Sequence, residues 1–283
     1  MARMPSQNCP VPRRVGIVHK QTSLDAAACA TAAAQYLASR GVAVLTDEEE
    51  AARHADLVLV LGGDGTLIHA AGILEGRPVP ILGVNMGSLG FLTEVPQSEL
   101  YQAIEHVLAG KAEVSERMKL RVHVHRGGDP DDKILDLEVL NDAVIAKGTL
   151  SRMAEFEATS SGDFVTRYRA DGIIVATPTG STAYSLAANG PILHPAMRGV
   201  ILAPICPHTL TQRPIVLPDD QTVNIVVTSD SEVHLTLDGQ TGVALGQRDR
   251  VQIKQSHNRV LLVRNQKIDY FGILRAKLKW GER

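Results

Sequence analysis

The chain has 283 residues, of which 44% are hydrophobic and 21% charged, and its net charge is −2. This length and apolar content suffice for about two domains. The balanced charge, without a long Lys/Arg run, excludes a binder of the nucleic-acid backbone, and an aromatic content of only 4% argues against a stacking surface for single strands.

The three cysteines, Cys9, Cys29 and Cys206, are far apart and include no C-x-x-C pair. We therefore expect reduced thiols rather than a disulfide framework or a metal site. The first residues have no apolar segment typical of a signal peptide, and no apolar run approaches the roughly 20 residues of a membrane span. The sequence thus predicts a soluble, cytoplasmic protein.

The first third of the chain alternates predicted strands and helices. Ser23 is a suitable N-cap for the first helix, and Gly41 is a suitable C-terminal stop. The strands are almost continuously apolar, which indicates a parallel sheet with helices on both faces. Strands are expected at 13–20, 42–47, 55–63 and 79–85, and helices from Ser23 to Gly41, from about Thr66, and over 97–110.

The pattern changes near residue 118, where alternating and β-branched segments separated by turn signals begin. They predict a mostly antiparallel β domain of sandwich type. Helices are expected at 181–189 and 269–280, the second returning to the first domain. The predicted domains are an α/β domain, 1–118 with 266–283, and a β-rich domain, 119–265.

The segment Gly62-Gly63-Asp64-Gly65-Thr66 follows an apolar strand and precedes a helix. It is neither a Walker A loop, which needs a following Gly-Lys, nor G-x-G-x-x-G, because Ile68 replaces the last glycine. Backbone N–H groups at such a helix start can hold an anion, and a plain turn needs fewer glycines. A carboxylate would repel a phosphate there, so Asp64 is expected to have another role.

Two further segments place polar residues beside apolar strands. Asn141-Asp142 is expected at the end of an apolar strand and by itself is more typical of a solvent-facing turn. Asp171-Gly172 precedes a strand, and 177–182 follows it as a loop of hydroxyl-bearing and small residues leading into a helix with Tyr184. Hydroxyls, exposed N–H groups and a helix start together predict a site for a sugar phosphate or ring ligand.

Other polar residues give weaker signals. His123 and His125 share one face of a predicted strand, but no third ligand accompanies them, and we expect no zinc site. Gln240, in Leu-Asp-Gly-Gln, is by itself typical of a turn between strands.

Taken in order, G-G-D-G-T, N-D and D-G-I-I-V-A-T-P-T-G-S-T-A-Y-S resemble the bacterial NAD kinase family. The resemblance covers 57–280, and its third motif is highly specific, whereas lipid kinases and 6-phosphofructokinase-type enzymes carry loops like the first. Many members have Asn-Glu where this chain has Asn141-Asp142, so the carboxylate is kept but is one methylene shorter. The resemblance implies an α/β domain followed by a β-sandwich-like domain. It also implies homo-oligomers, commonly tetramers with dimers as the alternative, in which a neighbouring subunit can supply part of the site.

The activity implied by the resemblance is transfer of the γ-phosphate of ATP to the 2′-hydroxyl of the adenosine ribose of NAD, giving NADP. A divalent cation, normally Mg²⁺, accompanies it, and no metal-ligating side chain is assigned. Asp64 and Gly65 would lie at the reacting hydroxyl, where Asp64 can orient it and accept its proton late in a loose phosphoryl transfer. The other implied contacts are Asn141 and Asp142 at the adenine or ribose, Asp171 and Arg169 near the nicotinamide amide, Thr182, Ala183, Tyr184, Ser185, Leu186 and Ala187 along the dinucleotide pocket, and Arg152 and Gln240.

Two alternatives stay open. A lipid or sugar kinase of the same superfamily is one, although the 171–187 motif suits a dinucleotide and no interfacial amphipathic helix is visible. The other is a non-catalytic NAD(P)-binding sensor, although a protein that has lost catalytic activity would not need the charge on Asp64.

Overall fold

The structure, a computed structural model, describes residues 7–148 and 153–281. The chain forms two compact units, Met1–Arg117 with Asn258–Arg283 and Met118–His257. The C-terminal segment thus belongs to the unit that begins the chain, as expected. No helix of the described part is long and apolar enough to cross a membrane, and the three cysteines are free thiols.

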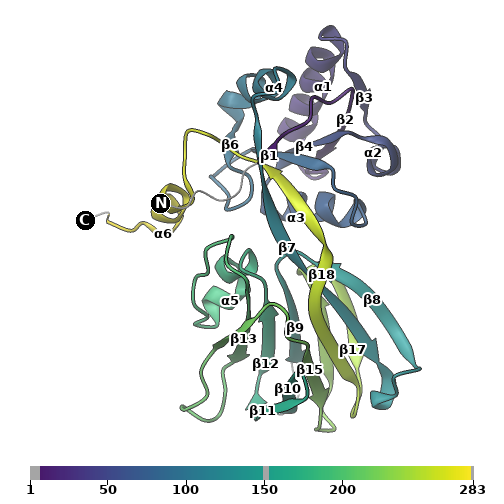
Figure 1. The fold of residues 1–283 in the computed structure, drawn as a ribbon, viewed down its shortest axis with the longest axis vertical. Helices are drawn as coiled ribbons and strands as arrows, with labels where there is room; N and C mark the ends of the chain where they lie inside the picture. Colours follow the sequence, from purple (N-terminus) through teal and green to yellow (C-terminus); the bar gives the residue numbers. More distant parts are fainter. Residues whose placement is uncertain (1–6, 149–152, 282–283) are drawn as a thin grey trace. The chain divides into compact units, whose positions relative to one another are not determined.

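A parallel sheet lies at the centre of the first unit (Figure 1), in the order β3-β2-β4-β5 followed by the end of β18. The strands β4 and β5 are buried along their whole length, which explains their uninterrupted apolar sequences. The strands are β2 Arg14–His19, β3 Ala43–Leu45, β4 Leu57–Gly62, β5 Pro80–Asn85 and β18 Arg250–Val263, with the two-residue strands β1 Gln7–Asn8 and β6 Val95–Pro96 beside them.

Helices cover both faces of this sheet. Buried side chains of α1 and α4 share one core with β4 and β5. On the other face, α2 packs closely on Gly16, where a Cβ would lie 2.6 Å from that of Ala51. The expected α/β architecture is confirmed. The helices are α1 Leu24–Ser39, α2 Glu48–His54, α3 Asp64–Ile73, α4 Leu100–Leu108 preceded by the 3-10 helix Gln97–Glu99, and α6 Tyr270–Leu278.

The helix termini follow local signals in part. The Ser23 hydroxyl accepts from Ala26 N at 3.2 Å, and Gly41 has a φ of +77°, so both predicted ends of α1 are confirmed. The start expected at Thr66 was wrong by two residues, since α3 begins at Asp64. Helix α2 was not expected: it is short and buries only Ala51, so it has no apolar periodicity.

The second unit consists of two antiparallel sheets. One has the order β14-β13-β12-β9-β16-β17, and the other runs β11-β10-β15-β18, after which β18 also pairs β7 and β7 pairs β8. One hydrophobic core contains side chains from both sheets, among them Phe156 of β10 and Ile173 of β12, which confirms the sandwich type. The strands are β7 Glu113–His125, β8 Lys133–Val139, β9 Asp142–Lys147, β10 Ala154–Ser160, β11 Asp163–Ala170, β12 Gly172–Ala176, β13 Gly199–Ile205, β14 Ile215–Pro218, β15 Val223–Val227, β16 Val233–Leu237 and β17 Thr241–Leu245.

The helix expected over 181–189 is much shorter than predicted. It comprises a 3-10 turn, Gly180–Thr182, and α5, Tyr184–Ala187. Ala183 between them has a non-helical backbone, with ψ at −133°, and Asn189 has a φ of +61°. These two conformations limit the helix to four residues.

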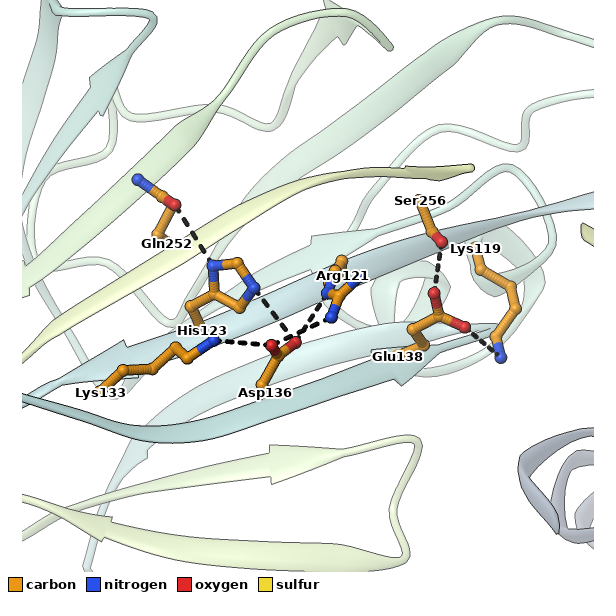
Figure 2. A network of polar contacts seen from close by, with 8 residues as sticks. All are labelled: Lys119, Arg121, His123, Lys133, Asp136, Glu138, Gln252 and Ser256. Carbon is orange, nitrogen blue, oxygen red and sulfur yellow. Dashed lines mark hydrogen bonds and ion pairs between the residues drawn. The ribbon is translucent and has the colours of Figure 1, made fainter. Parts of the chain in front are cut away.

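A network of polar side chains lies on β7 and β8, on the face away from the sandwich core (Figure 2). Asp136 accepts from Arg121 at 2.6 and 3.0 Å and from Lys133 at 2.8 Å, and it lies 3.1 Å from Nε2 of His123. The Arg121 guanidinium holds the pKa of Asp136 well below its usual range. His123 thus belongs to an ion-pair network. The described residues contain no group of three His, Cys, Asp or Glu side chains that would hold a metal ion.

In the same network, Glu138 lies 2.8 Å from Nζ of Lys119 and also accepts from the hydroxyl of Ser256 (Figure 2). Both members of this ion pair are largely buried. A buried pair depends on both partners, because either charge alone is poorly solvated.

Candidate functional site

The glycine-rich loop of the first unit joins β4 to α3. Gly63 is the N-cap and Asp64 the first helical residue. A Cβ on Gly62 would lie 2.4 Å from the hydroxyl of Thr66, whereas a Cβ on Gly63 or Gly65 would meet nothing within 4 Å. Gly62 is therefore required by packing, and the two other glycines leave space over the start of the helix, where an anion is favoured.

The carboxylate of Asp64 is held by a segment almost thirty residues further along the chain. Oδ2 accepts from Phe91 N at 2.8 Å, and Oδ1 accepts from Leu92 N and Thr93 N, both at 3.0 Å. The Thr93 hydroxyl adds a fourth bond to Oδ1 at 3.1 Å. These four donors, together with the helix N-terminus, offset the cost of a negative charge in the loop.

The buried amide of Asn85 holds the Thr93 hydroxyl, one of the four donors to Asp64. Nδ2 of Asn85 donates to the Thr93 hydroxyl at 3.0 Å, and Oδ1 of Asn85 accepts from Gly87 N at 2.6 Å. Gly90 must be glycine, since a Cβ there would lie 2.1 Å from Oδ1 of Asp64 and 2.3 Å from the Thr93 hydroxyl. Asn85, Thr93 and the Gly90 backbone thus fit closely around the Asp64 carboxylate.

A buried ion pair follows the segment that holds Asp64. Glu94 accepts from Asn265 N at 3.1 Å and lies 3.7 Å from Nη2 of Arg117. Burial raises the pKa of Glu94, and the charge of Arg117 opposes that rise. Among the described residues, Nε and Nη1 of Arg117 have no hydrogen-bond partner.

In the second unit, the Asn141-Asp142 turn packs against the loop that follows β12. The Thr177 hydroxyl donates to Leu140 O at 2.6 Å, and Thr177 N donates to Asn141 O at 2.9 Å. A Cβ on Gly180 would lie 2.1 Å from Asn141 O, so only glycine permits this approach. The expectation that Asp142 ends a strand was wrong: Asp142 is the first residue of β9 and pairs with Ala176.

Asp142 itself is only 5% exposed. Burial, and then the neighbouring Asp238 carboxylate, raise the pKa of Asp142 to about 7. The second unit thus contains two neighbouring carboxylates, of which Asp142 is buried and Asp238 half-buried, beside a loop rich in hydroxyls.

Comparison with known proteins finds relatives that match most of the chain. The model of the ATP-NAD kinase N-terminal domain matches residues 46–112, and that of the ATP-NAD kinase C-terminal domain matches 140–265. The NAD kinase of Geobacter metallireducens is 51% identical over 251 residues, 88% of this chain and 86% of that protein. The NAD kinase of Citrifermentans bemidjiense is 47% identical over 291 residues, 96% of this chain and all of that protein.

The chain belongs to the ATP-NAD kinase family. It is therefore an enzyme, a kinase, and the resemblance drawn from its motifs is confirmed. Two solved structures of related kinases share the fold at 25% identity. A yeast NADH kinase complexed with NADH has a TM-score of 0.89, covering 98% of this chain and 90% of that one. An NAD kinase from Archaeoglobus fulgidus in complex with ATP has a TM-score of 0.76, covering 93% and 99%.

For this member of the ATP-NAD kinase family, the structure places the predicted site residues in both units. Asp64 and Gly65 belong to the first unit, and the other described candidates belong to the second. Arg152 lies outside the described residues. Gln240 is exposed in the hairpin between β16 and β17.

The segment from Thr182 to Ala187 is mixed in its exposure. Tyr184 is 48% exposed, whereas the Ser185 side chain is fully buried, and its hydroxyl has no hydrogen-bond partner among the described residues. Thr182, Ala183 and Leu186 are half-buried, and Ala187 is exposed. The side chain of Ser185 therefore does not line a surface of this chain.

Asp171 does not lie beside the Asn141 turn. It precedes β12, whereas Thr177 follows that strand, so about 20 Å separate the two positions at roughly 3.4 Å per residue. Asp171 instead lies 3.2 Å from Nζ of Lys147. Arg169, exposed on β11, lies near Asp171 in the chain. Asp171 and Asn141 therefore mark two separate ends of β12.

Sequence reasoning missed Asn85, Gly90, Thr93 and Asp238. The first three carried one usable signal, because the closely spaced glycines after β5, Gly87 and Gly90, mark a constrained loop. Asp238 carried no such signal, because Asp-Gly is common in hairpin turns.

Proposed function

We propose that the chain transfers the γ-phosphate of ATP to the 2′-hydroxyl of the adenosine ribose of NAD, giving NADP. Family membership supports the activity, and the observation that carries the site is the Asp64 carboxylate, fixed by four donors at the start of α3. Such fixed geometry is what phosphoryl transfer requires from a protein, since positioning and electrostatics supply most of the catalysis.

Asp64 is the proposed catalytic residue, and its contacts indicate which oxygen acts. A carboxylate has about four lone-pair sites on its two oxygens. Of the contacts described, three are on Oδ1 and one on Oδ2, so Oδ2 is the oxygen that accepts the ribose hydroxyl. As the bond from the ribose oxygen to the γ-phosphorus forms and the bond to ADP breaks, the hydroxyl proton passes to Oδ2.

The second unit is proposed to bind the dinucleotide. Asn141 and Asp142 offer an amide and a carboxylate to the adenine or ribose, next to the hydroxyls of the Thr177–Thr182 loop. Buried Ser185 contributes through packing or its backbone. The remaining proposed contacts are Gly65 at the reacting hydroxyl, Thr182, Ala183, Tyr184, Leu186 and Ala187 along the pocket, Asp171 and Arg169 near the nicotinamide amide, and Arg152 and Gln240.

A divalent cation, normally Mg²⁺, belongs to this proposal, because it neutralises charge on the ATP phosphates. Mg²⁺ in nucleotide sites takes most of its ligands from phosphates and water, with one or two carboxylates. This fits the described residues, which contain no group of three ligating side chains. We propose that the ATP phosphates and water supply these ligands, because the lone pairs of Asp64 are taken by its four donors and by the ribose hydroxyl.

We also propose a cytoplasmic homo-oligomer, a tetramer in preference to a dimer. Light scattering of the purified protein at several concentrations tests the oligomeric state directly.

The test of the activity is NADP formation from NAD, ATP and Mg²⁺, coupled to an NADP-specific dehydrogenase. We expect a signal that disappears without ATP and in the Asp64→Asn variant. NAD binding without turnover would instead support a non-catalytic sensor. Failure to bind NAD would favour a lipid or sugar kinase, to be tested with those acceptors.

A further inference from the structure

Asp238 occupies the turn of the β16–β17 hairpin. Leu237 pairs with Thr241 across this hairpin, so the turn consists of Asp238, Gly239 and Gln240. Asp238 has a φ of +50° and Gly239 a φ of +68°. Asp and Asn are the non-glycine residues that best tolerate this left-handed conformation, so the turn by itself accepts either residue.

The carboxylate of Asp238 reaches a segment nearly one hundred residues earlier in the chain. Its Oδ2 accepts from Leu140 N at 2.7 Å, and its Oδ1 accepts from Asn141 N at 2.7 Å and Asp142 N at 3.1 Å. Asp238 N in turn donates to Asp142 O at 3.0 Å. Three consecutive N–H groups thus depend on one carboxylate, and four hydrogen bonds join the hairpin to the turn between β8 and β9.

These bonds explain how that turn keeps its conformation. Leu140 and Asn141 lie between the two strands. The Leu140 carbonyl accepts from the Thr177 hydroxyl, and the Asn141 carbonyl accepts from Thr177 N. The Asp238 carboxylate satisfies their N–H groups. The backbone of the turn is therefore held from two directions, and the Asn141 and Asp142 side chains project from a fixed frame.

We propose that Asp238 is a positioning residue for dinucleotide binding, which acts by holding the Leu140–Asp142 backbone. This inference rests on the proposed function. An unpaired buried N–H group is costly. The three N–H groups use both oxygens of Asp238, so a neutral side chain with a single acceptor oxygen cannot fully replace it.

The two carboxylates are not equivalent. Burial raises the pKa of Asp238, and the three N–H bonds that it accepts and the charge of Lys119 oppose that rise. The pKa of Asp142 is raised first by burial and then by the neighbouring Asp238 carboxylate. Removing the charge of Asp238 should lower the pKa of Asp142.

The test is Asp238→Asn, which keeps the size and the tolerance for positive φ but replaces Oδ2 by an amide group facing Leu140 N–H. We expect the Kd and KM for NAD to rise about tenfold or more, with the KM for ATP within twofold. The acid limb of the pH profile of NAD binding should also move to lower pH. A defect of stability alone would lower the melting temperature without weakening NAD binding more than ATP binding.

The matched control is Asp249→Asn. Asp249 is a buried aspartate of the second unit that, like Asp238, accepts backbone N–H bonds, from Gly127 N at 2.9 Å and Gly246 N at 2.8 Å, and it also pairs with Arg126. This variant should lose stability while its Kd for NAD stays within twofold of wild type. Equal NAD affinity in Asp238→Asn and wild type would overturn the positioning role.

A second readout does not depend on NAD. Amide hydrogen exchange of Leu140, Asn141 and Asp142 should accelerate at least tenfold in Asp238→Asn and not in Asp249→Asn; unchanged protection would overturn the proposed contact. If wild type binds no NAD, the proposed function fails. Under that outcome, the exchange data still support or refute the role of Asp238 in holding the turn.

Discussion

The carboxylate of Asp64 accepts from both the backbone N–H and the hydroxyl of Thr93, at 3.0 and 3.1 Å. The direction of the second bond is set by Asn85, whose Oδ1 accepts from Gly87 N and whose Nδ2 therefore faces the hydroxyl. The single proton of the hydroxyl is left for Asp64. Asp64 is thus surrounded by donors, and Oδ2, with one described contact, keeps a lone pair for a further donor.

Replacing Asp64 by Asn should lower kcat by about 10²–10⁴-fold, with the Kd for NAD within about threefold. The amide group cannot accept the proton, and its NH₂ faces an N–H donor, so the melting temperature should also fall slightly. Stopped-assay turnover and calorimetric NAD binding measure the two effects. Turnover within a few-fold of wild type would rule out the proton-acceptor role.

The hydroxyl of Thr93 can be tested with two variants of similar size. Thr93→Val removes the donor to Asp64 and the acceptor for Asn85 in a buried position, which should cost about 1–3 kcal/mol of stability and lower kcat about tenfold. Thr93→Ser restores the hydroxyl and should recover most of kcat. If valine and serine variants turn over equally, the hydroxyl does not position Asp64.

Gly90→Ala should displace the Asp64 carboxylate, because the added Cβ would lie 2.1 Å from its Oδ1. We expect kcat to fall by two orders of magnitude or more. The control is Gly72→Ala in α3, where a Cβ meets nothing within 4 Å and where alanine favours the helix by roughly 0.5–1 kcal/mol. If Gly72→Ala also loses activity, the loss in Gly90→Ala cannot be assigned to the contact between the added Cβ and Asp64.

Asp142 should make both binding and stability depend on pH near neutrality. Its pKa is raised to about 7, so the folded chain holds this proton in a range where the unfolded chain has lost it. The free energy of unfolding should therefore fall as pH rises from about 4 to 7 through this group. NAD binding through the ionised carboxylate should strengthen over the same range.

The variant Asp142→Asn removes this titration. Its free energy of unfolding at pH 8 should match or exceed that of wild type, while its NAD affinity should be weaker and less dependent on pH. Urea unfolding and NAD titration at pH 5, 6, 7 and 8 measure the two trends. An unchanged pH dependence in the variant would assign the titration to another group.

The network of Figure 2 contains a buried and an exposed lysine that can be compared. Lys119→Met removes the largely buried ammonium group that lies beside Glu138 and should cost about 3–5 kcal/mol in urea unfolding. Lys133→Met removes one of two exposed partners of Asp136, the other being Arg121, and should change stability by less than about 1 kcal/mol. Equal effects would mean that the burial of Lys119 does not govern the energy of its pair.

The sequence by itself determined the local structure and the family. Ser23 and Gly41 bound a helix through bonds within a few residues, and the apolar runs of β4 and β5 specify buried parallel strands. The GGDGT loop and the 171–185 motif identified the kinase family, because each motif is a contiguous segment. Helix α2 was not predicted from the sequence, because a single buried alanine gives no apolar periodicity.

Only the tertiary structure decided which groups meet. The donors to Asp64 come from Phe91–Thr93, and the carboxylate that holds Asn141 and Asp142 comes from Asp238. Backbone N–H groups are present in nearly every residue and leave no mark on the sequence, so these partners cannot be read from residue types. The raised pKa of Asp142 likewise depends on burial and on a charge brought close by the pairing of β9 with β16. Local propensity depends on neighbours in the chain, whereas desolvation and long-range hydrogen bonding depend on neighbours in space.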